Sequence, residues 1–149
     1  MMPMTAPTLT ELYEADETAW LDAMAELIRA KRFDEFDCDH LAEYLSDMAA
    51  RERREVQSRL IVLLAHWIKW TYQPERRSRS WQVTIVEQQQ ELDIHLGRGV
   101  LRQFAETVLA DVYVKAVRRA AIETGLGEST FPEDCPFTFD QLLTANPMS

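Results

Sequence analysis

The strongest constraint on the fold of this chain is its shortage of residues that interrupt helices. Only four glycines and six prolines occur among 149 residues, and few of them lie in the middle of the chain. Long segments instead carry apolar residues at intervals of three and four, the period of a helix that buries one face. No segment alternates apolar and polar residues as a half-buried strand does, and no segment is repeated. The sequence therefore predicts an all-α fold.

Helix-start signals divide the first part of the chain. Thr8 and Glu11 have the spacing of a capping box, and Asp16 can cap a helix again. We therefore expect a short helix and then a longer one that ends near Lys31. The loop of residues 33–37 is expected to place both of its phenylalanines in the core.

The next segment predicts a very long helix over residues 39–72. Asp39 is its expected cap, and Pro74 ends it because the residue before a proline is pushed out of helical geometry. A kink is expected at residues 50–54, since an unbroken helix of this length would be about 51 Å long. Its expected inner face is made of Leu41, Leu45, Met48, Val56, Leu60, Leu63, Leu64, Trp67 and Thr71.

Two further long helices and a short one complete the prediction. Ser78 or Ser80 is the expected start of the third long helix, and a turn at residues 97–99 leads to the fourth. Gly125 marks the end of the fourth helix, because glycine readily adopts the left-handed conformation that terminates helices. An irregular segment that contains prolines follows, and a second capping box at Thr138 precedes a short last helix.

A chain of this length can bury about two-thirds of its unfolded surface, enough for a hydrophobic core. We expect a single domain over residues 1–149, folded as a compact bundle of four or five principal helices with an irregular, proline-containing C-terminal tail. The helical core is expected at about residues 8–143, with residues 1–7 and 144–149 as flexible ends.

Charge is distributed unevenly along the chain. The net charge of −9 divides into −9 for residues 1–50, +5 for residues 51–119 and −5 for residues 120–149. The overall acidity argues against a broadly basic nucleic-acid binder and against binding to anionic lipid. A basic middle between acidic ends indicates that these segments attract each other, within the fold or between subunits.

The sequence also predicts the compartment. The N-terminus lacks the basic and apolar regions of a signal peptide. The longest apolar run, residues 60–68, is interrupted by His66 and is too short to cross a membrane. Cys38 and Cys135 are too few for a disulfide framework and lack the spacing of a zinc site. We therefore expect a cytoplasmic protein with reduced thiols and no membrane partner.

Several runs of residues resemble a bacterial family known as domain of unknown function twenty-nine. The resemblance extends from about residue 10 to residue 143 and implies a compact helical bundle of bacterial origin, with no established activity. Relatives often carry further arginines after the motif's last tryptophan, whereas this chain has Gln82 and Val83 there, which argues against a polyanion-binding role for this helix. The runs are LYE at residues 12–14, LAHWIKWTYQPERRSRSW at 64–81, ETGL at 123–126 and TFPEDCPF at 130–137.

The middle of this motif contains the candidate binding residues. Arginines beside the free amides of a helix start can hold a phosphate group, and aromatic rings can stack on a base. In the alternative that we favour, the arginines have a structural role: they tie down helix-end carbonyls and pair with the acidic N-terminal segment. The candidates are His66, Lys69, Tyr72, Arg76, Arg77, Arg79, Ser80 and Trp81.

Signatures of catalysis and metal binding are weak. The sequence has no glycine-rich phosphate loop and no hydrolase motif, and it places no orienting partner beside His66. Residues 37–40 gather four potential ligands, but adjacent side chains point in different directions. The pair Glu91 and His95 is explained more simply as surface residues on one helix face, as are Glu43 and Asp47. We therefore expect no catalytic residue, no metal and no cofactor.

The sequence favours a non-enzymatic protein-interaction or scaffold module, with a second copy of the chain as one candidate partner. The alternative is a binder of phosphate groups or nucleic acid through residues 76–81. A weaker alternative is a metal-dependent hydrolase that uses His66 or His95 with nearby carboxylates.

Overall fold

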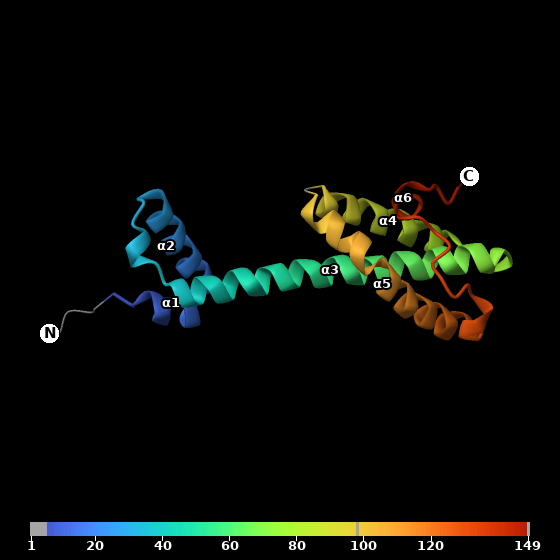
Figure 1. Ribbon diagram of the computed structural model, residues 1–149, viewed down its shortest axis with the longest axis horizontal. Helices are drawn as coiled ribbons and strands as arrows, with labels where there is room; N and C mark the ends of the chain where they lie inside the picture. Colours follow the sequence, from blue (N-terminus) through green and yellow to red (C-terminus); the bar gives the residue numbers. More distant parts are fainter. Residues whose placement is uncertain (1–5, 98, 149) are drawn as a thin grey trace. The chain divides into compact units, whose positions relative to one another are not determined.

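The computed structural model describes residues 6–97 and 99–148, and this part of the chain is built from helices without any strand (Figure 1). The all-α prediction is thereby confirmed. The helices are α1 (Leu9–Ala15), α2 (Glu17–Arg29), α3 (Cys38–Tyr72), α4 (Arg79–Leu96), α5 (Val100–Thr124) and α6 (Phe139–Thr144), with 3₁₀ turns at Phe33–Glu35, Pro74–Arg76 and Glu128–Thr130.

The chain divides into two compact units. Unit 1 comprises Met1–Ala50 and contains α1, α2 and the first part of α3, whereas unit 2 comprises Arg51–Ser149 and contains the remainder. The single-domain expectation stays a prediction that unfolding experiments can test. The flexible ends expected from the sequence fall in part on residues 1–5 and 149, which lie outside the described residues.

Local capping signals set the helices of unit 1 as the sequence predicts. The hydroxyl of Thr8 accepts a hydrogen bond from the amide of Glu11 at 3.2 Å, and the carboxylate of Glu11 accepts one from the amide of Thr8 at 3.1 Å. The carboxylate of Asp16 then accepts from the amide of Ala19 at 3.0 Å and starts α2. These bonds satisfy amides that have no partner inside the helix.

The core of unit 1 is small. Trp20 is fully buried, its ring contacts those of Tyr13 and Tyr44, and its Nε1 donates to the carboxylate of Asp37 at 3.2 Å. The expectation that both loop phenylalanines enter the core is wrong, because Phe33 is 58% exposed. Phe33 lies in the 3₁₀ turn and packs edge-on against Phe36, with the ring centroids 5.6 Å apart.

The start of α3 also differs from the prediction. The helix begins at Cys38, so Asp39 lies in its first turn and is not its cap. Asp37 precedes the helix, and its carbonyl accepts from the amide of Leu41 at 2.9 Å. The helix continues without interruption through residues 50–54, and a kink there stays a prediction.

The end of α3 and the helices of unit 2 follow the predicted signals. The helix ends at Tyr72 before Pro74, as expected. The hydroxyl of Ser78 accepts from the amide of Trp81 at 3.2 Å, which selects Ser78 as the cap of α4. Gly125 ends α5 with a φ of +75°, a left-handed conformation that glycine adopts without steric cost.

In unit 2, α4 returns along the second part of α3, α5 crosses that part, and the C-terminal segment carries α6 back to α4 (Figure 1). Gln89 on α4 holds this segment by donating to the carbonyls of Leu142 at 3.0 Å and Ala145 at 2.9 Å. The end of α3 is therefore enclosed, and Leu60, Leu63, Leu64 and Ile68 are fully buried. None of the helices described has the length and apolar character needed to cross a membrane.

Candidate functional site

The enclosed end of α3 carries two of the candidate residues into the interior. Every residue from Leu63 to Lys69 is buried, as expected for a helix surrounded by neighbours. His66 and Lys69 are thus 8% and 4% exposed, although both side chains are polar. Burial of polar groups carries a free-energy cost unless hydrogen bonds or ion pairs compensate for it.

His66 is satisfied by the helix itself. Its Nδ1 lies 2.8 Å from the carbonyl oxygen of Val62, and because a carbonyl only accepts, Nδ1 carries the proton. Burial lowers the pKa of His66, and the nearby charge of Lys69 lowers it further, against the opposing effects of Val62 and Glu123. The imidazole is therefore neutral at neutral pH.

Lys69 is buried and forms an ion pair with a partly exposed residue of α5. Its Nζ lies 2.5 Å from Oε2 of Glu123 and 4.9 Å from the centroid of the Trp81 ring. The other carboxylate oxygen of Glu123 accepts from Nε of Arg119 at 2.7 Å. Burial raises the pKa of Glu123, but the hydrogen bonds and charges of Lys69 and Arg119 outweigh it, so the net shift is downward. The pair joins α3 to α5.

Gln73, one helical turn after Lys69, is a buried residue that the sequence analysis did not single out. It is 7% exposed, and its Oε1 is buried without a hydrogen-bond partner among the described residues. A glutamine after an apolar helix gives no signal that its oxygen will be enclosed, because enclosure depends on distant segments.

The arginines of the motif lie on the surface, and one of them is held in place. Nε of Arg77 donates to the carbonyl of Trp70 at 2.8 Å, and its guanidinium lies 4.7 Å from the centroid of the Trp70 ring. This contact ties down a carbonyl near the end of α3, as the structural alternative predicts. Arg76, Arg79 and Ser80 are exposed.

The structure therefore separates the candidates and does not gather them around one cavity. Tyr72 contacts Phe131 with the ring centroids 5.9 Å apart. Together with Trp67 and Thr71 it lines a hollow of about 400 Å³ whose other wall comes from residues 136–145. None of the candidate arginines lines this hollow. Among the described residues, the aromatic and basic candidates therefore do not line a common cavity.

The sequence-predicted ligand groups are engaged in other contacts. Asp37 accepts from Trp20 and lies 2.7 Å from Nδ1 of His40. Burial raises the pKa of Asp37. The hydrogen bonds to the side chains of His40 and Trp20 lower it, as do a hydrogen bond to the His40 backbone and the charge of His40, and the net shift of the pKa is downward. His95 lies 3.6 Å from Glu52 of α3. Among the described residues, no three His, Cys, Asp or Glu side chains are grouped as a metal site requires.

Two surfaces went unnoticed in the sequence analysis. One is the exposed apolar part of unit 1, where Leu45 and Met48 were expected to be buried. The other is a groove beside α5, bounded by the irregular segment of residues 128–137. The signal for the groove was the presence of Phe131 and Phe137 among prolines, but a list of apolar residues does not reveal a concave surface.

Comparison with known proteins gives a family and no function. No curated protein and no solved structure matches the chain significantly. Residues 12–147, nearly the whole chain, match the family described as domain of unknown function DUF29. The protein therefore belongs to the DUF29 family.

Proposed function

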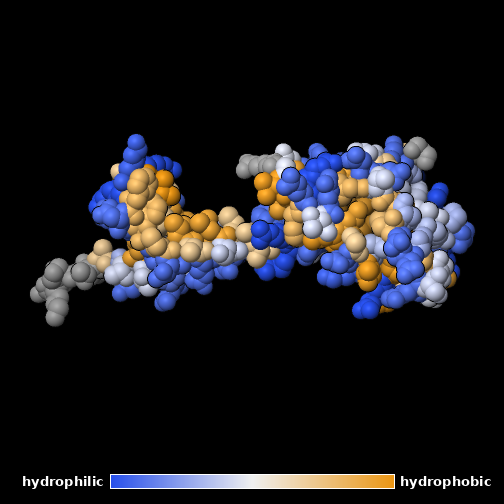
Figure 2. All heavy atoms as spheres, viewed as in Figure 1, coloured by the Kyte–Doolittle hydropathy of each residue, from blue (hydrophilic) through white to orange (hydrophobic). Residues whose placement is uncertain are grey.

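We propose that the protein is a protein-interaction module that binds its partner through the apolar surface of unit 1. The observation that supports this most directly is the exposure of four large apolar side chains within 50 residues. They are Ile28 at 49%, Phe33 at 58%, Leu45 at 55% and Met48 at 45%. Figure 2 shows hydrophobic surface over α2 and over the first part of α3.

The arrangement on α3 distinguishes this surface from scattered apolar residues, which are normal on soluble proteins. Leu45 and Met48 are three residues apart and Leu41 precedes Leu45 by four, so all three lie on one helix face. Leu41 is more buried than the other two, which are 55% and 45% exposed. A continuous apolar stripe of this kind gains free energy when a partner removes it from water.

Charge indicates the kind of partner. Residues 1–50 contain 12 acidic and 3 basic side chains, a net charge of −9. A second unit 1 would bring another charge of −9 to the same surface, which disfavours pairing between identical units. A partner segment that combines apolar side chains with lysines or arginines complements both the stripe and the charge. The compartment that we propose is the cytoplasm, where Cys38 and Cys135 stay reduced.

The test is binding of a synthetic amphipathic helical peptide with leucine on one face and lysine on the other, measured by fluorescence anisotropy. We expect Leu45→Ser together with Met48→Ser to weaken binding by about tenfold or more, since both side chains would be buried at the contact. The matched control replaces two exposed apolar residues of unit 2, Ile94→Ser with Ile122→Ser. Equal binding by the two double variants would contradict the proposal.

A second candidate function is binding of phosphate groups or nucleic acid at the start of α4. It is supported by the exposure of Arg76 and Arg79 beside the first turn of that helix. We expect a single-stranded oligonucleotide to bind more weakly as salt increases, and Arg76→Ala with Arg79→Ala to reduce the slope of that dependence. The control is Arg54→Ala, another exposed arginine. If the affinity for the oligonucleotide changes neither with salt concentration nor in the double variant, this function is excluded.

A further inference from the structure

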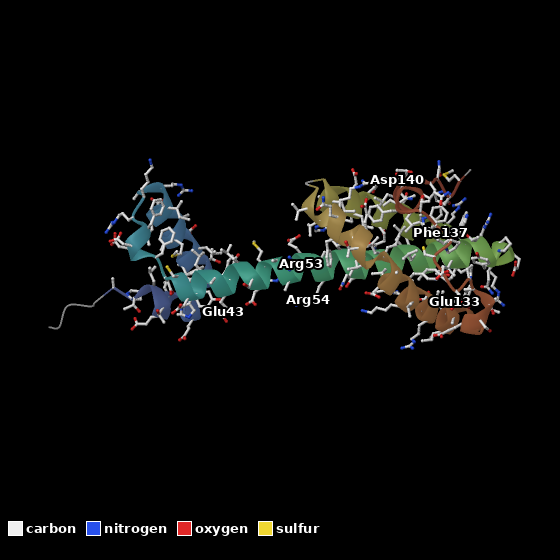
Figure 3. The ribbon with its side chains drawn as sticks, in the orientation of Figure 1. Glu43, Arg53, Arg54, Glu133, Phe137 and Asp140 are labelled. Carbon is white, nitrogen blue, oxygen red and sulfur yellow. The ribbon has the colours of Figure 1, made fainter. Side chains whose placement is uncertain are left out.

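A groove runs beside α5 in unit 2. Two adjoining hollows, of about 490 Å³ and 510 Å³, share Tyr113, Val114 and Glu133. Their walls are one face of α5 and the segment of residues 128–137. We call this surface the α5 groove. Figure 3 labels Glu133 and Phe137 on the segment that leads from α5 to α6.

The sequence explains why this groove is not filled by the chain itself. The buried face of α5 consists largely of small residues such as Ala116 and Ala120, and their small side chains allow α5 to pack close to the core. Val114 lies on a different face and is 63% exposed. The segment after α5 contains Pro132 and Pro136, which prevent a continuous helix that would cover this face.

The far wall of the groove is fixed. The hydroxyl of Tyr113 donates to the carbonyl of Pro132 at 2.6 Å, and the neighbouring Phe131 is buried against Tyr72. A tyrosine hydroxyl is protonated at neutral pH, and burial raises the pKa of Tyr113 to about 12, so this donor is kept well into the alkaline range. A groove whose walls are already in place needs little reorganisation to bind a segment.

The floor of the groove is apolar, and the charged residues that line its two hollows are acidic. Two basic residues of α5, Lys115 and Arg118, lie beside Val114, and Arg118 is 3.5 Å from Glu128. The hollow of about 510 Å³ is lined by the apolar residues Leu109, Val114 and Phe137 and by four acidic ones, with no basic side chain among its lining residues. Of the four, Glu106 is engaged with Arg102 at 3.4 Å. The acidic residues are Glu106, Asp111, Glu133 and Asp134.

We propose that the α5 groove binds a short cationic segment of another protein. An apolar side chain of the segment enters the floor at Val114, and its lysines or arginines face the carboxylates of Glu133 and Asp134. The eleven-residue step along α5 from Glu106 to Val117 is about 16 Å, which accommodates about five extended residues. This site lies in unit 2 and is independent of the function proposed for unit 1.

The experiment uses the full chain and the fluorescent peptide Lys-Leu-Lys-Leu-Lys, with Glu-Leu-Glu-Leu-Glu and Lys-Ser-Lys-Ser-Lys as peptide controls. We expect saturable binding of the first peptide only. Val114→Ser and the double variant Glu133→Gln with Asp134→Gln should each weaken it at least tenfold. Their matched controls are Ile94→Ser and Glu87→Gln, exposed residues of α4 that should change binding less than twofold.

Two cysteines provide a second readout. Cys135 is half-buried and lines the groove, whereas Cys38 is exposed and belongs to unit 1. Burial raises the pKa of Cys135, so its alkylation by iodoacetamide is slow and easily followed. We expect the peptide to slow alkylation of Cys135 further and to leave the rate at Cys38 unchanged.

Three results would overturn the proposal. The first is an absence of saturable binding. The second is a loss of binding in Leu45→Ser that Val114→Ser does not share, together with protection of Cys38, which would assign the peptide to unit 1. The third is a dimer in the native mass spectrum that Val114→Ser abolishes, because the occupant would then be a second copy of the chain. A failure of the first kind leaves the test of unit 1 unaffected, since that test uses a different peptide and different variants.

Discussion

The two units of this protein use the same kind of amphipathic helix with opposite results. In unit 2, the second part of α3 is enclosed, and Leu60, Leu63 and Leu64 are fully buried. In unit 1, the first part of the same helix leaves Leu45 and Met48 about half exposed. The core of unit 1 holds Trp20 and Met24, whereas that of unit 2 draws on four helices and the C-terminal segment.

This difference shows what an apolar stripe specifies. A stripe indicates that a helix face gains free energy by leaving water, but it does not identify the surface that covers it. In unit 2 the chain supplies that surface through α4, α5 and the C-terminal segment. In unit 1 the described residues leave Leu45 and Met48 about half exposed, and this exposure is what supports the partner proposed for unit 1.

The largest contrast is expected between two leucines of α3. Leu64→Ala should lower the free energy of unfolding by about 2–5 kcal/mol, because it removes buried methyl groups and leaves a cavity. Leu45→Ala should change it by less than about 0.5 kcal/mol, because Leu45 is already exposed. Urea unfolding measures both, and the single-domain prediction requires one transition for each variant. A large loss in Leu45→Ala would show that this residue is buried in solution.

The ion pair between the buried Lys69 and the partly exposed Glu123 gives the next effect. Lys69→Met should lower the free energy of unfolding by about 2–4 kcal/mol, because it leaves the partly buried Glu123 with Arg119 as its remaining partner. Lys115→Met on α5 is the control, since Lys115 is exposed. If the two methionine variants unfold at the same urea concentration, the pair does not hold α3 to α5.

A gain in stability is expected at Gln73. Gln73→Leu should raise the free energy of unfolding by about 1–2 kcal/mol, because it removes a buried acceptor that has no partner. Gln90→Leu, at an exposed position of α4, should leave it nearly unchanged. A loss of stability in Gln73→Leu would show that a bound water satisfies the oxygen.

The stability effects of removing each of the two capping boxes can be compared between the units. Thr138→Ala should lower the free energy of unfolding by about 1 kcal/mol, because α6 contributes the buried residues Phe139 and Leu142 to unit 2. Thr8→Ala should affect α1 alone, which buries no residue. Hydrogen exchange should then be faster in α1 without a change in global unfolding. Equal effects on global unfolding would contradict the difference between the units.

The smallest effect concerns the pH dependence of stability. The pKa of His66 is below its ordinary value of 6.5 in the folded chain, so the unfolded chain binds the proton more tightly. Its contribution to stability is complete above pH 6.5 and is lost as the pH falls through the lowered pKa. His66→Gln should reduce the loss of stability between pH 7.5 and pH 5, measured by urea unfolding. The effect is limited because Val62 and Glu123 oppose the desolvation.

Features that depend on neighbours in sequence were predicted well. The capping boxes at Thr8 and Thr138 and the helix end at Gly125 each involve residues within one turn, so the amino-acid types suffice to identify them. For α4 the sequence left Ser78 and Ser80 as alternative caps, and the structure selects Ser78. Asp39 was misplaced as a cap because Asp37 competes for the same role two residues earlier, and the contacts of Asp37 with Trp20 and His40 were not visible in the sequence.

The candidate site was predicted only in part, because its parts depend on distant segments. Lys69 and Trp81 are both candidate binding residues from the sequence, and in the structure the ammonium group of Lys69 contacts the ring of Trp81. The ion-pair partner of Lys69, Glu123, lies 54 residues away, and nothing in the sequence near either residue indicates that they pair. Gln73 was not recognised as buried, because the C-terminal residues that help enclose this end of α3 are also remote in sequence.

The sequence by itself determined that this chain is helical, where most of its helices begin and end, and that its first 50 residues are strongly acidic. These properties depend on backbone hydrogen bonds, capping side chains and composition, all of which act locally or additively. Only the tertiary structure decided that Lys69 is buried and Leu45 exposed, and that a groove remains beside Val114. Burial is a property of what lies opposite a side chain, and the periodicity of a helix contains no information about the opposing surface.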